Sequence, residues 1–123
     1  MPRIDKDQSV NYLDYVPSRA IEHEIGDNGR YVLLRPKFMR GILARFLQPH
    51  INSKHFKVRL DDFGSKTWAS INGRRTVAEI ADMLYEEFGD TIEPRYERCS
   101  KFLNSLHQGA MITLELKQRV SEE

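Results

Sequence analysis

The spacing of hydrophobic residues changes near residue 61, and this change restricts the fold more than any other feature of the chain. Before it, residues 20–25 and 56–60 alternate apolar with polar side chains and residues 30–35 are rich in strand-forming types, which predicts three strands. After it, apolar residues recur at helical spacing over 61–71, 77–88 and 94–108. We therefore expect an α+β, winged-helix-like fold, with a three-stranded antiparallel sheet packed on three C-terminal helices and Trp68 central in the core.

Local signals mark where these elements begin and end. Residues 26–29 read Gly-Asp-Asn-Gly, types that tolerate positive φ, so the two flanking strands are predicted to form a hairpin. The sequence Thr76-Val77-Ala78-Glu79 matches a capping box at a helix N-terminus. Pro94 suits the first position of the last helix. Residues 111–116 fit either a short closing strand or a docked tail.

The rest of the chain is expected to lie outside this fold. Residues 1–16 read as a polar, partly flexible N-terminal arm, the domain spans 17–116, and residues 117–123 are a C-terminal tail. Residues 36–55 form an insertion between the second and third strands. Within it, residues 37–48 place apolar side chains at helical spacing opposite basic ones, which predicts an extra amphipathic helix.

Charge is unevenly distributed, although the formal net charge is only +1. Residues 1–59 hold 11 Lys+Arg and 6 Asp+Glu, whereas residues 60–123 hold 8 and 12. The segment 35–59 contains seven basic residues and no acidic one, a pattern that attracts an acidic peptide, a nucleic acid or an anionic surface. An alternative interpretation is a solvated loop facing the acidic half of the molecule. The N-terminus carries no apolar stretch typical of a secretory signal, so we expect a cytoplasmic protein.

The sequence contains few residues that suggest catalysis or metal binding. The four histidines, at positions 23, 50, 55 and 107, do not have the spacing of a metal site. Cys99, the single cysteine, falls on the apolar side of the last predicted helix, where a buried thiol is inert. Glycine-rich phosphate-binding motifs are absent. We therefore expect a protein that is not an enzyme and that needs no metal or other cofactor.

Three stretches together resemble a known family. They are residues 56–68 (FKVRLDDFGSKTW), residues 71–80 (INGRRTVAEI) and residues 102–109 (FLNSLHQG). This combination is similar to the PqqD-like family, named for a coenzyme PQQ synthesis protein, over roughly residues 17–112. The resemblance implies a small winged-helix-like, non-enzymatic domain of the kind called a precursor-peptide recognition element. Such domains hold the leader of a ribosomally made peptide for a modifying enzyme, often a radical SAM protein.

The resemblance also implies which residues bind the peptide. Its leader would add as a strand beside the third strand, with side chains entering a cleft lined by the last helix. Carried over to this chain, the strand residues are Phe56, Lys57, Val58 and Arg59, and the helix residues are Arg95, Arg98, Cys99, Phe102, Leu103 and Leu106. Helical spacing by itself predicts that most of the helix residues are core. The insertion at 36–55 and the N-terminal arm depart from the family, so its PQQ precursor is not carried over as the ligand.

We therefore predict a non-catalytic peptide-binding module, a recognition element or peptide chaperone that presents a peptide to an enzyme. One alternative is a winged-helix nucleic-acid-binding protein, which the net negative charge of residues 60–123 disfavours. Another is a scaffold or adaptor that docks on an enzyme or membrane through residues 37–48. Edge strands also pair with themselves, so a homodimer through residues 56–60 is a further alternative.

Overall fold

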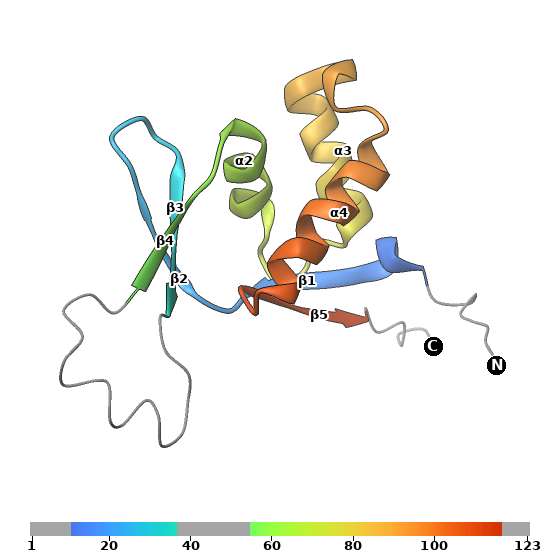
Figure 1. Ribbon diagram of the computed structural model, residues 1–123. Helices are drawn as coiled ribbons and strands as arrows, with labels where there is room; N and C mark the ends of the chain where they lie inside the picture. The colour runs from blue at the N-terminus through green and yellow to red at the C-terminus, as the bar shows by residue number, and fades with distance from the viewer. Residues whose placement is uncertain (1–10, 37–54, 117–123) are drawn as a thin grey trace. The chain divides into compact units, whose positions relative to one another are not determined.

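The computed structural model describes residues 11–36 and 55–116 (Figure 1). It has an α+β fold with a three-stranded antiparallel sheet and three helices, as the spacing predicts. The chain divides into two compact units, one formed by residues 1–20 and 66–123 and the other by residues 21–65. We call them the helical unit and the sheet unit. The predicted helix at 37–48, the first ten residues and the tail at 117–123 lie outside the described residues.

The sheet unit contains the three predicted strands. They are β2 (Glu22–Ile25), β3 (Tyr31–Pro36) and β4 (His55–Arg59), which pair antiparallel in the order β2-β3-β4 (Figure 1). The predicted turn joins β2 to β3, where the Gly26 N–H donates to the Arg30 carbonyl at 2.8 Å. Gly29 has a φ of 83°, a backbone conformation that glycine adopts without a steric penalty. The hairpin and the third strand are therefore confirmed.

The helical unit contains a second, two-stranded sheet. Its strands are β1 (Tyr15–Arg19) and β5 (Ile112–Leu116), which pair antiparallel with Pro17 opposite Leu114. A 3-10 turn, η1 (Tyr12–Asp14), leads into β1. Of the two alternatives for residues 111–116, the strand is therefore correct. We did not predict β1, because a central proline is tolerated only on an edge strand and its partner lies almost a hundred residues away. The predicted boundary between residues 16 and 17 falls inside this strand.

The three helices begin close to where the capping signals predict. They are α2 (Asp62–Ser70), α3 (Val77–Phe88) and α4 (Arg95–Gln108), with a 3-10 turn, η3 (Gly89–Ile92), between the last two. The capping box is present: the Glu79 N–H donates to Thr76 Oγ1 at 3.1 Å, and the Thr76 N–H donates to Glu79 Oε1 at 2.8 Å. Each bond satisfies a backbone donor that the helix cannot satisfy itself. Of these helices, α2 spans the division between the units, which falls after Ser65.

The core of the helical unit is formed by α3, α4 and the end of α2. Trp68 is fully buried, as expected, and its carbonyl accepts a 2.8 Å hydrogen bond from the Arg19 guanidinium. The other core side chains are aliphatic or small, and most come from the predicted helical stripes (Ile71, Val77, Ile80, Ala81, Leu84, Ile92, Cys99, Leu103, Leu106 and Ile112). Among the described helices, none combines the length and the apolar character that crossing a bilayer requires.

Candidate functional site

The strand β4 lies at one end of the three-stranded sheet. Over residues 11–36 and 55–116, its only paired strand is β3. The register shows which backbone groups this pairing uses, because the Leu60 N–H donates to the Tyr31 carbonyl at 3.0 Å. Hydrogen-bonded pairs alternate along an antiparallel ladder, so Phe56 and Val58 also direct their backbone groups toward β3. The N–H and C=O groups of Lys57 and Arg59 therefore point away from β3, toward the outer edge of the sheet.

The side chains of β4 alternate between the two faces of the sheet. Val58 lies opposite Leu33, which lies opposite His23, so these residues share one face with Phe56. Leu33 on this face is fully buried, whereas Phe56 is 49% exposed. Lys57 and Arg59 are on the opposite face with Glu24 and Val32. The strand thus has an apolar face, formed by Phe56 and Val58, and a basic face, formed by Lys57 and Arg59. The two residues of the basic face are also the ones whose backbone groups point outward.

The basic residues of this unit differ in how they are neutralised. Arg30 Nε lies 2.8 Å from Asp62 Oδ1, and this hydrogen-bonded ion pair lowers the pKa of Asp62 and raises that of Arg30. Lys57 Nζ lies 3.8 Å from Glu24 Oε1, a looser contact between two half-exposed side chains. Arg59 is exposed, and its side chain makes no ion pair or hydrogen bond within the described residues. Arg59 is therefore the basic side chain of β4 that can accept a ligand without losing a partner.

A surface pocket of about 630 Å³ adjoins these residues. It lies entirely within the sheet unit, between the end of β4 and the hairpin turn. Its lining includes Glu24, Lys57 and Arg59 from the strands and residues 26–28 from the turn. Asp61 also lines it, but the Asp61 carboxylate accepts a 2.8 Å hydrogen bond from the Gly64 N–H and so caps α2. This pocket could not be predicted from the sequence, because it depends on the register of three strands.

Three of the predicted helix residues are core residues of the helical unit. Cys99 and Leu103 are fully buried and Leu106 is 3% exposed. Burial raises the pKa of the Cys99 thiol to about 12, because a thiolate there would lose its hydration. The thiol Sγ lies 4.0 Å from the Val77 carbonyl. Cys99 therefore remains protonated near neutral pH, and the core interpretation that we drew from helical spacing is correct for these three side chains.

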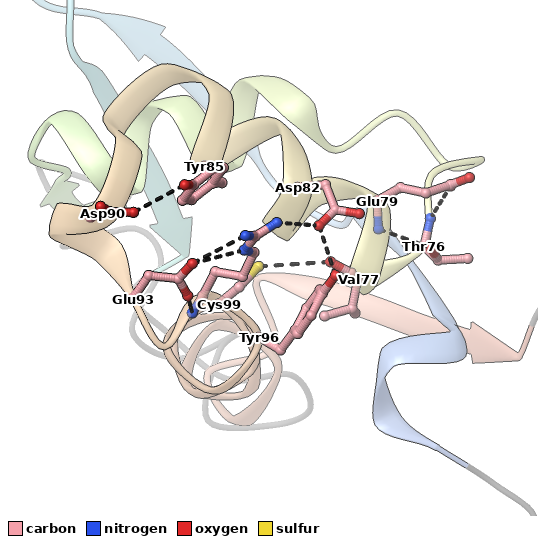
Figure 2. A network of polar contacts seen from close by, with 10 residues as sticks. Thr76, Val77, Glu79, Asp82, Tyr85, Asp90, Glu93, Tyr96 and Cys99 are labelled. Carbon is pink, nitrogen blue, oxygen red and sulfur yellow. Dashed lines mark hydrogen bonds and ion pairs between the residues drawn. The ribbon is translucent and has the colours of Figure 1, made fainter.

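Arg95 binds acidic and aromatic side chains of its own unit. Its guanidinium lies 3.0 Å from Asp82 on α3 and 3.1 Å from Glu93, just before α4. Its central carbon also lies 3.8 Å from the centre of the Tyr85 ring, a cation–π contact. Figure 2 shows Asp82 and Glu93 directed toward the same region between α3 and α4, with the Tyr96 hydroxyl donating to Asp82 at 2.8 Å. Arg95 therefore joins α3 to α4 and the turn between them.

Hydrogen bonding by Arg95 also changes the acidity of its neighbour. The Arg95 backbone N–H donates to Glu93 Oε1 at 2.8 Å, and the guanidinium donates to Oε2. Together these bonds hold the pKa of Glu93 below its ordinary value, the backbone bond contributing most. These partners could not be predicted from the sequence, because helical spacing within α4 does not relate Arg95 to residues on α3 or in the preceding turn.

Two of the predicted helix residues remain near the surface. Arg98 is exposed on α4, and Phe102, one turn further on, is half-buried. The strand residues Phe56, Lys57, Val58 and Arg59 belong to the sheet unit, whereas all six helix residues belong to the helical unit. A single peptide site formed by both sets stays a prediction.

The described residues contain no group of three or more His, Cys, Asp or Glu side chains that could hold a metal ion. The titratable clusters that they do contain, around Arg95 and around Arg30, consist of ion pairs between exposed or partly exposed side chains. Such exposed pairs contribute modestly to stability. The groups that β4 exposes for contact are the outer backbone groups and basic side chains of Lys57 and Arg59 and the half-exposed ring of Phe56.

Comparison with known proteins identifies a family. A family model described as coenzyme PQQ synthesis protein D (PqqD) matches residues 51–112, from just before β4 to the first residue of β5. Searches of the curated proteins and of the solved structures gave no match. The family match spans half of the chain and includes all three stretches that carry the resemblance in sequence. The chain therefore belongs to the coenzyme PQQ synthesis protein D (PqqD) family.

Proposed function

We propose that this protein is a non-catalytic peptide-binding module that recognises a precursor or leader peptide and presents it to a modifying enzyme. Membership of the PqqD family supports this role, since proteins of this family act as accessory recognition proteins. The proposed partner enzyme is a radical SAM protein or another enzyme that modifies peptides, and the proposed location is the cytoplasm. No cofactor takes part in the proposed function.

The observation that carries the proposal is the outer edge of β4. Lys57 and Arg59 direct two N–H and two C=O groups away from β3, as the register requires. An extended peptide that adds as a further strand satisfies such groups with main-chain hydrogen bonds, which supply affinity independent of the peptide's sequence. Side chains beside the added strand then supply specificity.

Both faces of β4 offer contacts to an added strand. Phe56 and Val58 provide apolar surface on one face, and Lys57 and Arg59 provide positive charge on the other. Positive charge favours an acidic peptide and accelerates its encounter more than it deepens affinity. We also propose that Arg98 and Phe102 of α4 contact the peptide, because their side chains remain near the surface. Cys99, Leu103 and Leu106 would act indirectly, by holding α4 in place.

The sharpest test distinguishes the contribution of the β4 backbone to peptide binding from the contribution of its positive charge. Both Lys57→Pro and Lys57→Gln remove the ammonium group and its contact with Glu24. Only the proline also removes the outward N–H, and proline is tolerated on an edge strand where the N–H faces away from its neighbour. In calorimetric titrations with acidic leader-like peptides encoded beside the gene, we expect Lys57→Pro to bind much more weakly than Lys57→Gln. Thermal unfolding of both variants provides the control for folding.

The same titrations distinguish the alternatives. Equal binding by the two variants would contradict strand addition at β4. Binding of duplex DNA, with no binding of any peptide, would support the nucleic-acid alternative instead. Pelleting with liposomes or with an enzyme, again without peptide binding, would support the adaptor alternative. A homodimer through β4 would appear as a concentration-dependent change in sedimentation that Lys57→Pro abolishes.

A further inference from the structure

The register of β4 also specifies what kind of peptide the edge prefers. In an added strand, each residue lies on the same face as the β4 residue opposite it, and successive residues alternate between the faces. Residues opposite Lys57 and Arg59 therefore lie on the basic face, and those opposite Phe56 and Val58 lie on the apolar face. This alternation is the same whether the peptide runs parallel or antiparallel to β4. The preferred pattern consequently does not depend on the direction of binding.

The charges on the basic face indicate which residue distinguishes an acidic guest side chain from a neutral one. Lys57 already has a carboxylate nearby, since its Nζ lies 3.8 Å from Glu24 Oε1. Arg59 has no such contact within the described residues, and it is exposed beside the 630 Å³ pocket. A guanidinium also offers two parallel N–H donors to one carboxylate, which an ammonium group does not. A guest carboxylate opposite Arg59 therefore gains more than one opposite Lys57.

The pocket supplies the space for that carboxylate. It is lined by Arg59 and Lys57 at the β4 side and by residues 26–28 at the hairpin side, where Asp27 carries a negative charge. Of the other acids that line it, Glu24 contacts Lys57, and Asp61 accepts a hydrogen bond from the Gly64 N–H at the N-terminus of α2. A guest carboxylate is therefore drawn to the β4 side of the pocket and repelled from the hairpin side. It is expected to bind beside Arg59 at the edge of β4 and not beside the hairpin turn.

From the register, the charges and the pocket we infer that the guest of β4 is a peptide strand with acidic side chains at positions i and i+2 and apolar side chains at the positions flanking them, and that Arg59 selects the acidic residue. This inference rests on the proposed strand addition and adds the substrate class and the specificity-determining residue. It assigns the pocket beside Arg59 to the guest's acidic side chain.

The test uses synthetic peptides that need no knowledge of the natural ligand. One peptide alternates valine with glutamate, a second has glutamine in place of each glutamate, and a third has the composition of the first with its acidic and apolar residues in separate blocks. Binding to the full-length protein is measured by calorimetry at low and at high salt. We expect the alternating acidic peptide to bind about two- to five-fold more tightly than the glutamine peptide, as opposite cross-strand charges do. This preference should shrink in high salt.

Two protein variants with the same change in net charge test the role of Arg59. Arg59→Glu alters the basic face, whereas Arg74→Glu alters an exposed arginine in the helical unit and serves as the matched control. We expect Arg59→Glu to lose the preference for glutamate over glutamine, and to prefer a valine–lysine peptide. Arg74→Glu should behave like the wild type. Arg59→Gln, which removes the charge without reversing it, should show no preference between the glutamate and glutamine peptides.

The outcomes separate this inference from the proposed function. If the glutamate and glutamine peptides bind equally well, or if Arg59→Glu and Arg74→Glu keep the same preference, the inference is wrong while strand addition stands. Tighter binding of the blocked peptide than of the alternating one would also overturn it. If none of the peptides binds, and the leader-like peptides encoded beside the gene fail as well, both the inference and the proposed function are wrong.

Discussion

Arginine performs different tasks in the two units of this protein. In the helical unit, Arg95 lies about 3 Å from two carboxylates and stacks on a tyrosine ring. These contacts neutralise its charge and join α3 to α4. In the sheet unit, Arg59 is exposed and lacks such partners within the described residues. The comparison teaches that a basic residue is a candidate for binding only when the fold has not already supplied its counter-charge. Both residues looked equally suited to binding in the sequence.

The backbone groups at the start of α3 and at the outer edge of β4 differ in the same way. At the start of α3, Thr76 and Glu79 satisfy donors that the helix leaves open. On β4, the outward groups of Lys57 and Arg59 have no partner strand in the described part of the chain. Unpaired edge groups are a liability that proteins otherwise protect, and they are also what strand addition requires. The start of α3 thus has its donors satisfied, whereas the outer edge of β4 has the open groups that the proposed strand addition uses.

The largest expected effect comes from removing the centre of the helical unit. Trp68→Ala should lower the free energy of unfolding by about 3–5 kcal/mol, because a fully buried large side chain leaves a cavity that the core cannot refill completely. Chemical denaturation followed by circular dichroism measures this loss. Ala69→Ser, at the exposed neighbouring position, serves as the control and should change little. A loss below about 1 kcal/mol for Trp68→Ala would contradict the core described here.

Cys99 should make the helical unit sensitive to alkaline pH. Its pKa is about 12 in the folded protein and about 9 when unfolded, so the folded state holds its proton more tightly. That contribution to stability is complete below pH 9 and is lost as the pH rises toward 12, with a slope of at most about 1.4 kcal/mol per pH unit. Cys99→Ala should lose stability less steeply over this range. Parallel slopes for the two proteins in denaturation between pH 8 and pH 11 would contradict the burial of the thiol.

The capping box should contribute a smaller amount. Thr76→Ala removes the side-chain acceptor of the Glu79 N–H and should cost about 1 kcal/mol, whereas Thr76→Ser keeps the hydroxyl and should cost little. Urea denaturation of the three proteins measures the difference. An equal cost for both substitutions would mean that the hydroxyl does not cap α3.

The two arginines should differ when each is replaced by glutamine. Arg95→Gln should lower the Tm measurably, because it removes the ion pairs with Asp82 and Glu93, while Arg59→Gln should leave the Tm nearly unchanged. The pKa of Glu93 is lowered in the folded protein, so its stabilising contribution is present above its unfolded pKa and is lost as the pH falls. The backbone N–H of residue 95, which contributes most to this shift, remains in Arg95→Gln, so only the part of the Tm difference that comes from the guanidinium should shrink in acid. Equal Tm shifts for the two variants at pH 7 would break the comparison between the units.

The smallest effect concerns amide exchange on β4. The amides of Phe56 and Val58 face β3 and should exchange slowly with solvent, whereas those of Lys57 and Arg59 face outward and should exchange faster. A bound guest strand should slow the outward pair and leave the inward pair little changed. NMR exchange rates with and without an acidic peptide measure this directly. The opposite alternation would mean that the register of β4 is shifted by one residue.

Features that depend on neighbouring residues could be predicted from the sequence. The turn at residues 26–29, the capping box at Thr76 and the helical stripe that buries Leu103 each arise from interactions within a few positions, so local chemistry predicted them correctly. The tertiary structure alone decided the pairing of β1 with β5, the partners of Arg95 and the side of β4 that faces outward. These depend on segments far apart in the chain. Each segment could pair with several others, and the spacing of residues within one segment does not indicate which pairing is the most stable.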